Sequence, residues 1–183
     1  MKIILQTERL LLRELHTNDY QDLCEILQDQ ETMFAFEHAF SDDEVNEWLD
    51  RQLCRYQSEG HGLWAVLHQQ SNEFLGVCGI TIQTINKKQY LEIGYLFKKK
   101  QWHKGYATEA AIGCRQYAFE TLKADKIYSI IRNSNAPSQN VAKRLDMKKV
   151  DEITKHYYGM DMLHYVFEVA LTPESAKTPK NFH

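Results

Sequence analysis

The feature that most limits how this chain can fold is a strand, a tight turn and a long helix that follow one another in mid-sequence. An apolar, strand-like run over 90–98 meets a turn centred on Gly105, and a helical pattern follows over 104–122 with small residues along one face. A second apolar run over 127–132 has the composition of a strand. Two strands joined through a helix pair in parallel. This stretch therefore predicts a βαβ unit whose small-faced helix packs closely onto a sheet.

The turn between the first strand and the helix has the properties of an anion-binding site. The first turn of a helix leaves N–H groups without intrahelical partners, and the helix dipole places partial positive charge there. Gly105 and Ala107 let a ligand approach the backbone. Four lysines add full charges around the turn: Lys98, Lys99, Lys100 and Lys104. The turn predicts a phosphate or pyrophosphate site, although small residues near a helix start also suit plain packing.

Two common phosphate-binding sequences are absent. The chain contains neither Gly-x-x-x-x-Gly-Lys-Ser/Thr, which marks a Walker loop, nor Gly-x-Gly-x-x-Gly, which marks a dinucleotide site. These two classes of phosphate-binding protein are therefore excluded, and we expect the turn to bind an anion that is typical of another class.

Local patterns divide the rest of the chain into strands and helices of one domain over 1–171. We expect strands at 9–15, 63–67, 74–82, 147–158 and 163–171. Helices are expected after Thr17 or Asn18, from the capping box Ser41–Glu44 to Gly60, and after Asn135. The last two strands would form a hairpin around Gly159, and residues 172–183 a C-terminal tail.

Composition excludes several classes of protein. Of the 183 residues, 43% are hydrophobic and 26% charged, as in ordinary soluble globular proteins. No run of about 18 apolar residues appears, and Glu8 and Arg9 interrupt the apolar N-terminus. The four cysteines are widely spaced, and no Cys/His cluster suggests a metal. We therefore expect a cytoplasmic protein with reduced thiols, no membrane association and no bound metal.

Charge is distributed unevenly along the chain. Residues 1–60 hold 14 Asp and Glu against 5 Lys and Arg, whereas residues 61–183 hold 11 against 17. This asymmetry fits a polyanionic cofactor on the basic part and a cationic amine near the acidic part. It argues against nucleic-acid binding, which requires a continuous basic face.

Four segments together are similar to a known family. The spacing Trp102-x-x-Gly105-x-Ala107 resembles the Gln/Arg-x-x-Gly-x-Gly/Ala element with which GNAT N-acetyltransferases hold the pyrophosphate of acetyl-CoA. Residues 7–13 resemble the opening of the branch that includes the ribosomal-protein N-terminal acetyltransferases, 61–80 its central hairpin, and 135–145 its last helix. The resemblance implies the α/β GNAT fold, a mixed sheet of about six to seven strands with four helices in the order βααβββαβαββ.

The resemblance also implies how acetyl-CoA is held. Backbone N–H groups of the 103–108 turn would bind the pyrophosphate, and the pantetheine arm would pair with the strand end at 96–98, where that strand splays from its parallel neighbour. A backbone N–H near Leu96 would face the thioester oxygen. The residues expected to bind this cofactor are Leu96, Phe97, Lys98, His103, Lys104, Gly105, Tyr106, Ala107, Thr108, Asn135 and Ser138.

Attack on a thioester requires a neutral amine, and a carboxylate is the usual base. Glu92 is the candidate because it lies in the apolar strand that leads to the turn. An acidic residue from 31–47 is the alternative for steering the amine. Ser138 matches the serine that contacts the sulfur in the ribosomal-protein branch, and many relatives carry a tyrosine acid where this chain has Ala142.

Two further positions depart from the family pattern. Trp102 stands where Gln or Arg usually begins the phosphate motif, so one phosphate contact is in doubt. Asp146-Met147 replaces the Gly-Phe that usually follows the last helix; Asp tolerates the left-handed conformation of a helix end, though less easily than Gly.

The acceptor is the least determined partner. Phe34, Phe36 and His38 lie between the first two helices, where the family shapes its acceptor pocket, and Tyr157 would face them; the same residues also suit packing onto the core. The resemblance favours a protein N-terminal α-amine, with a small amine such as an amino acid, polyamine or antibiotic as the alternative. A CoA-binding regulatory module without transferase activity is a third reading. We expect a monomer or homodimer.

Overall fold

The computed structural model describes residues 2–36, 38–157 and 159–171, so the predicted tail at 172–183 lies outside the described residues. Its strands are β1 (Ile3–Gln6), β2 (Leu10–Arg13), β3 (Leu63–His68), β4 (Phe74–Ile85), β5 (Lys88–Phe97), β6 (Lys126–Arg132), β7 (Lys148–Tyr157) and β8 (Met160–Ala170). Its α-helices are α1 (Tyr20–Leu27), α2 (Asp42–Ser58), α3 (Tyr106–Glu120) and α4 (Ala136–Arg144), and short 3₁₀ segments occupy Thr17–Asp19, Thr32–Phe36 and Lys99–Gln101.

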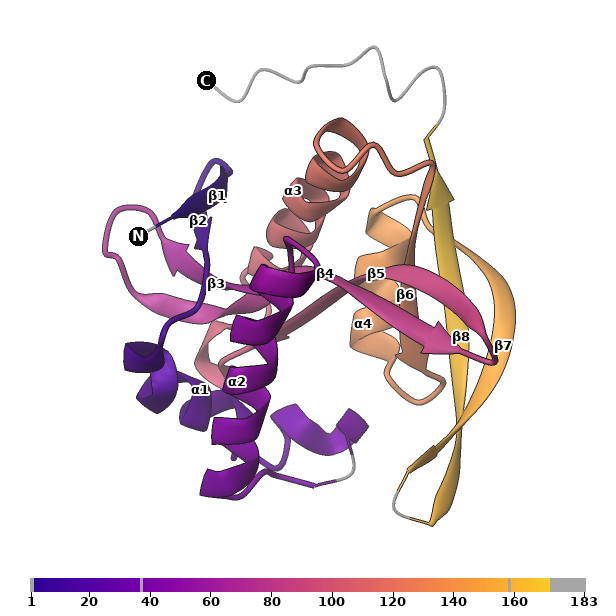
Figure 1. Cartoon of the computed structure of the whole chain (residues 1–183), viewed down its shortest axis with the longest axis horizontal. Coiled ribbons are helices and arrows are strands. Elements are labelled where there is room, and N and C mark those ends of the chain that lie inside the picture. Colours follow the sequence, from indigo (N-terminus) through magenta and orange to yellow (C-terminus); the bar gives the residue numbers. More distant parts are fainter. Residues whose placement is uncertain (1, 37, 158, 172–183) are drawn as a thin grey trace.

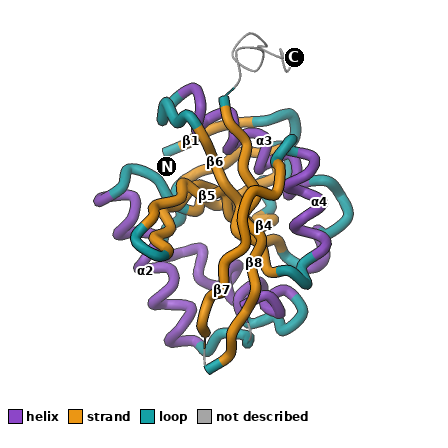
Figure 2. Tube along the Cα trace, turned by 90° about the vertical axis from the view of Figure 1, so that its right-hand side faces the viewer, coloured by secondary structure: helices purple, strands orange, loops and turns teal. Residues whose placement is uncertain are grey.

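The strands form one sheet in the order β1-β2-β3-β4-β5-β6-β8-β7. Every neighbouring pair is antiparallel except β5 and β6, which are parallel. The predicted βαβ unit is therefore confirmed, and its parallel strand pair, β5 and β6, lies at the centre of the sheet. α1 and α2 lie on one face of the sheet, and α3 and α4 on the other (Figures 1 and 2).

Side-chain alternation along the strands divides the interior into two cores. On the α3 side, the inward face of α3 is made of fully buried small residues, Ala110, Ala111, Cys114 and Ala118. On the other side, the apolar faces of α1 and α2 pack against strand residues such as Val77 and Leu96. The small-faced helix predicted from the sequence thus packs closely onto the sheet.

Local chemistry sets the starts of α2 and α4 as predicted, whereas the cap expected for the first helix at Thr17 or Asn18 was wrong, because both residues lie inside the 3₁₀ segment and Asp19 is the N-cap residue of α1. The Ser41 N–H donates to Glu44 Oε2 at 2.8 Å and the Glu44 N–H to Ser41 Oγ at 3.3 Å, which completes the capping box of α2. Asn135 Oδ1 accepts the Ser138 N–H at 3.2 Å at the start of α4. Asp146 has φ +61° immediately after α4, so an aspartate adopts the left-handed conformation there.

The predicted strand count was too low. The sheet has eight strands because Ile3–Gln6 forms an edge strand that pairs only with β2. A run of four residues shows too little alternation of polar and apolar side chains to predict a strand. Pairing with β2 at the edge of the sheet gives this segment its strand conformation. The β4–β5 hairpin is also longer than predicted, with a two-residue turn in which Asn86 and Lys87 both have positive φ, as in a type I′ turn.

Candidate active site

The parallel strands β5 and β6 separate soon after they meet. Among the described residues, their register joins only Glu92 with Tyr128. Beyond that point side chains bridge the strands: Ser129 Oγ donates to the Ile93 carbonyl at 3.2 Å, and the Ile130 N–H donates to Glu92 Oε1 at 3.1 Å. The predicted splay is therefore present, and it leaves the last residues of β5 without a β6 partner.

The alternation of antiparallel pairs tells which backbone groups of β5 face this gap. The Lys98 N–H donates to the Leu75 carbonyl at 2.9 Å, so the Leu96–Val77 pair, two residues earlier, is also a hydrogen-bonded pair. The N–H of Leu96 therefore points into the sheet. The N–H groups on either side of it, those of Tyr95 and Phe97, point toward the gap.

The turn before α3 is built for close backbone approach. His103 has φ +61° and Gly105, the N-cap residue of α3, has φ +83°. A Cβ at Gly105 would come within 3.4 Å of Arg9 Nη2, and the same guanidinium donates through Nη1 to the Lys104 carbonyl at 3.1 Å. The first N–H groups of α3 have no intrahelical partner, and Arg9 fixes the turn that precedes them.

Glu109, in the first turn of α3, attaches this helix to the opening segment at residues 7–13. Glu109 Oε1 accepts from Thr7 Oγ1 at 2.6 Å and from the Arg9 N–H at 2.8 Å, and Glu109 Oε2 accepts from Arg9 Nε at 2.7 Å. Burial alone would raise the pKa of Glu109, but these hydrogen bonds outweigh it and hold the pKa below its ordinary value. Sequence analysis missed this residue; an acidic residue in a helix's first turn was the available signal.

The lysines before the turn serve mainly to hold α1. Lys98 is buried, and its Nζ lies 2.6 Å from Asp22 and 2.9 Å from Glu25. Lys99 pairs with Glu31 at 2.5 Å, and Lys100 lies 3.7 Å from Glu25. The charge of Lys98 is therefore neutralised inside the protein and does not face an anion as expected, whereas Lys99 and Lys100 form exposed ion pairs.

Lys104 Nζ also has a protein partner, the Gln101 Oε1 atom at 2.8 Å. Part of the uneven charge along the chain is neutralised internally, because Lys98, Lys99 and Lys100 pair with Asp22, Glu25 and Glu31 of the first 60 residues.

The side chain of Glu92 lies on the face of the sheet that α1 and α2 cover, and α3 and α4 cover the opposite face. It is half-buried, and burial raises its pKa, against the opposing positive charges of Lys155 and Arg55 and the N–H bond from Ile130. A carboxylate with a raised pKa accepts a proton more readily near neutral pH than an exposed one. The position and the electrostatics of Glu92 both suit a base.

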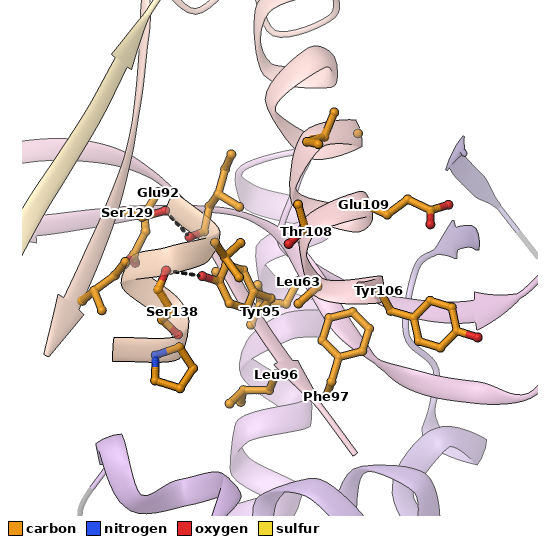
Figure 3. Close-up of a pocket in the computed structure, with 18 of the residues that line it drawn as sticks. Leu63, Glu92, Tyr95, Leu96, Phe97, Tyr106, Thr108, Glu109, Ser129 and Ser138 are labelled. Atoms are coloured by element: carbon orange, nitrogen blue, oxygen red, sulfur yellow. Dashed lines mark hydrogen bonds between the residues drawn. The ribbon is translucent and has the colours of Figure 1, made fainter. Parts of the chain in front are cut away.

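On the α4 side, Tyr95 and Ser138 face each other (Figure 3). Tyr95 Oη donates to the Ser138 carbonyl at 3.1 Å, and burial raises the pKa of Tyr95. Ala142, where the family resemblance leads us to expect a tyrosine, is buried in the α3-side core. Trp102 also has a defined role, because its Nε1 donates to the Phe97 carbonyl at 3.0 Å and fixes the turn to the end of β5.

One cavity of about 2160 Å³ connects these parts. It is lined by the turn and start of α3, by Tyr95 and Ser138, by Glu92, and by Phe34 and Phe36 of the segment before α2. Of the predicted cofactor residues, Lys98 and Lys104 are not among the described residues that line it. Phe34 and Phe36 are 44% and 49% exposed, so they border the cavity and do not pack into the core.

His38, another predicted acceptor residue, borders a different cavity. His38 pairs with Glu44 at 2.9 Å and borders a neighbouring cavity of about 570 Å³ together with Phe34 and Arg132. The side chain of Tyr157 lies outside the described part of the structure.

Comparison with known proteins agrees with this architecture. Residues 9–148 match the family described as "Acetyltransferase (GNAT) domain". The chain is 31% identical over 155 residues to the uncharacterized protein YkkB of Bacillus subtilis, covering 84% of this chain and 90% of YkkB. It is 27% identical over 147 residues to the uncharacterized N-acetyltransferase p20 of Bacillus licheniformis, covering 79% and 82%.

Solved structures share the fold at low identity. RimL, a ribosomal L7/L12 alpha-N-protein acetyltransferase in complex with coenzyme A, has a TM-score of 0.76 at 17% identity, covering 93% of this chain and 98% of RimL. A spermidine N-acetyltransferase from Vibrio cholerae, solved with CoA and spermine, has a TM-score of 0.72 at 17% identity, covering 88% and 95%.

Fold and site define an acyltransferase with a splayed central sheet. The family match extends over most of the chain, and the chain belongs to the GNAT acetyltransferase family as an N-acetyltransferase. Among the described residues, no helix is long and apolar enough to cross a membrane. The same residues contain no group of three or more His, Cys, Asp or Glu side chains placed to hold a metal ion.

Proposed function

We propose that this protein transfers the acetyl group of acetyl-CoA to a primary amine by direct attack. The observation that carries the proposal is the single cavity that runs from the N-terminus of α3, past the gap between β5 and β6, to Glu92. It joins an anion-binding helix start, an open strand edge and a half-buried carboxylate, which are the three parts that this transfer requires.

Residues of this chain fit the co-substrate. Gly105 adopts the positive φ that the turn from His103 to Thr108 requires, and the first N–H groups of α3, which have no intrahelical partner, are available to a phosphate there. The open edge of β5 offers the N–H groups of Tyr95 and Phe97 to a pantetheine amide or to the thioester oxygen. Acetyl-CoA, when bound, supplies the thioester that the amine attacks.

The catalytic roles follow from the side of the gap on which each residue lies. Glu92, on the α1–α2 face, takes a proton from the amine, directly or through a water molecule. An N–H of β5 stabilises the negative charge that develops on the thioester oxygen; such a donor contributes about 3 kcal/mol. Ser138, on the α4 side with Asn135 capping its helix, lies where the thiolate departs.

The acceptor that we favour is a protein N-terminal α-amine. An α-amine with a pKa near 8 is about one-tenth neutral at pH 7, whereas a lysine-like amine with a pKa near 10 is about a thousandth neutral. A single half-buried carboxylate suits the easier deprotonation. RimL acts on a protein α-amine and the spermidine enzyme on a small molecule, so small amines remain the second candidate.

The first experiment compares thermal unfolding with acetyl-CoA, with CoA and with NADH as the control ligand. At about 100 times its dissociation constant a ligand stabilises by about 2.7 kcal/mol, which is a shift of roughly 5–10 °C for a chain of this length. The shift should appear with the CoA compounds and not with NADH.

Thiol release from acetyl-CoA in the presence of amines then tests transfer. A protein that binds CoA but releases no thiol with any α-amine or small amine would be a regulatory module instead of an enzyme. Absence of a shift at saturating acetyl-CoA would overturn the cofactor assignment.

A further inference from the structure

The acceptor side of the cavity is more positive than a polyamine site would be. Glu92, Tyr128 and Arg132 share one face of the sheet, because Glu92 lies opposite Tyr128 and side chains alternate along β6. Arg132 lies opposite His164 on β8, and His164 lies opposite Ile153 on β7, two residues from Lys155. The three strands lie side by side (Figure 2), so Arg132, His164 and Lys155 share the face of Glu92.

All four side chains line the cavity, and Arg55 of α2 borders it from the helix side. The remaining carboxylates that line it lie elsewhere: Glu8 and Glu109 are near the start of α3, Glu120 is at the end of α3, and Glu31 pairs with Lys99. Of the described carboxylates that line the cavity, Glu92 is therefore the one that shares this face of the sheet, the floor of the cavity, with the two cations from β6 and β7; Glu168 and Asp151 are on the same face but do not line the cavity.

The electrostatics of the floor agree with this placement. Burial lowers the pKa of His164, and the positive charges of Lys155 and Arg132 lower it further, so His164 is neutral at pH 7 and both cations act on one small region. Arg132 donates through Nη1 to the Phe34 carbonyl at 2.9 Å. Its Nε and Nη2 atoms have no hydrogen-bond partner among the described residues.

We propose that the acceptor of the transfer carries a carboxylate several bonds away from its attacking amine, and that Arg132 and Lys155 bind this carboxylate while Glu92 faces the amine. The inference rests on the proposed function. Two cations beside one carboxylate repel a polyamine, which presents several positive charges, and attract an amine with an anionic group.

The distance between the amine and the carboxylate of the acceptor follows from the spacing of residues along β6. Tyr128, opposite Glu92, and Arg132 are four residues apart, which is about 13 Å along a β-strand. The side chains of Arg132 and Glu92 span part of this distance and leave several bond lengths between the amine and the anion. A peptide that begins with glutamate has this geometry, and so does a free dipeptide through its terminal carboxylate.

The test uses twin acceptors that differ in one charge. Thiol release from acetyl-CoA is measured with a peptide that begins with Glu and its Gln twin, with a free dipeptide and its amide, and with spermidine. A charged hydrogen-bonded pair typically changes affinity about tenfold or more. We expect the carboxylate twin to have a kcat/KM at least about tenfold higher, and the peptide and dipeptide arms to show which source supplies the carboxylate.

Variants assign the preference to the two cations. R132Q and K155Q should lower the ratio of kcat/KM for the carboxylate twin to kcat/KM for the amide twin toward one, and R132K should retain part of the preference. The ratio is the readout because Lys155 also acts on the pKa of Glu92, which changes the rate with both twins. K126Q is the matched control, because Lys126 begins the same strand but pairs with Glu168 at 2.9 Å, outside the cavity. Equal rates for the twins, faster transfer to spermidine, or an equal loss with both twins in R132Q and K155Q would overturn the proposal.

A binding measurement separates a failure of this inference from a failure of the proposed function. N-acetylated Glu and Gln peptides are added to the CoA-bound protein, and their dissociation constants are measured by titration. If no amine is acetylated but the acetylated Glu peptide still binds more tightly in an Arg132-dependent manner, the proposed function fails and the carboxylate site stands. If neither acetylated peptide binds, the carboxylate site fails.

Discussion

Replacing Glu109 with glutamine should loosen the attachment of α3 to the start of β2. The carboxylate accepts from Thr7 Oγ1, the Arg9 N–H, Arg9 Nε and Arg9 Nη2 at distances of 2.6 to 2.8 Å. Glutamine keeps one acceptor oxygen but turns an NH₂ group toward either the guanidinium or the Thr7–Arg9 donors. A charge-assisted hydrogen bond contributes about 1.5–3 kcal/mol.

Exposure reduces this figure. The side chain of Glu109 is 17% exposed and that of Arg9 is 41% exposed, so solvent screens part of the ion pair. We expect a loss of about 2 kcal/mol in unfolding free energy, which lowers the unfolding midpoint by roughly 4–8 °C. Because Arg9 also holds the Lys104 carbonyl, the dissociation constant for CoA should rise several-fold as well.

The assay is urea unfolding of the wild type and E109Q between pH 7 and pH 3.5, with E120Q as control. Glu120 is exposed at the other end of α3 and, among the described residues, its side chain accepts a hydrogen bond only from Gln116, so E120Q should change stability by less than about 0.5 kcal/mol. The lowered pKa of Glu109 means that its contribution is present above the unfolded value near 4.3 and is lost as pH falls through the folded pKa.

The difference between wild type and E109Q should therefore be largest from about pH 5 to pH 7 and shrink toward pH 3.5. Equal stability of E109Q and E120Q at pH 7 would refute the reasoning. A difference that stays constant down to pH 3.5 would show that the loss comes from shape and not from charge.

Three further changes test other parts of the site. E92Q should lower kcat by about 10²- to 10⁴-fold. It should not lower thermal stability at pH 8, because it removes a half-buried carboxylate whose raised pKa costs stability above the unfolded value. Wild-type activity should fall as pH drops through that raised pKa, and undiminished transfer by E92Q would exclude Glu92 as the base. G105A should weaken CoA binding severalfold in titration, because φ is +83° there and a side chain costs about 1 kcal/mol; unchanged affinity would contradict it. K98M should cost about 1–2 kcal/mol on thermal unfolding by leaving Asp22 and Glu25 without their buried cation, and the exposed K99M, measured alongside, should cost less than about 0.5 kcal/mol; equal losses in the two variants would count against the role of Lys98.

The sequence alone determined most elements of the fold, because their signals are local or periodic. The small residues along 107–118 predicted a helix packed on a sheet, and the buried face of α3 confirms it. The capping box at Ser41 and the Asn135 cap act between residues three apart, so they can be identified in the sequence. The splay beside Glu92 followed from the family resemblance. The four-residue strand β1 was missed because its edge position depends on β2.

Only the tertiary structure decided which groups face one another across the site. Glu109 meets Arg9 from 100 residues away, and Lys98 is buried between Asp22 and Glu25, although its place beside the turn suggested an anion-binding charge. Whether Leu96 or its neighbours offer an N–H to the gap depends on the pairing register with β4. The positive floor formed by Arg132 and Lys155 depends on strand order, since β8 lies between β6 and β7. These relations join segments that no local pattern connects, and chain packing alone brings them within bonding distance.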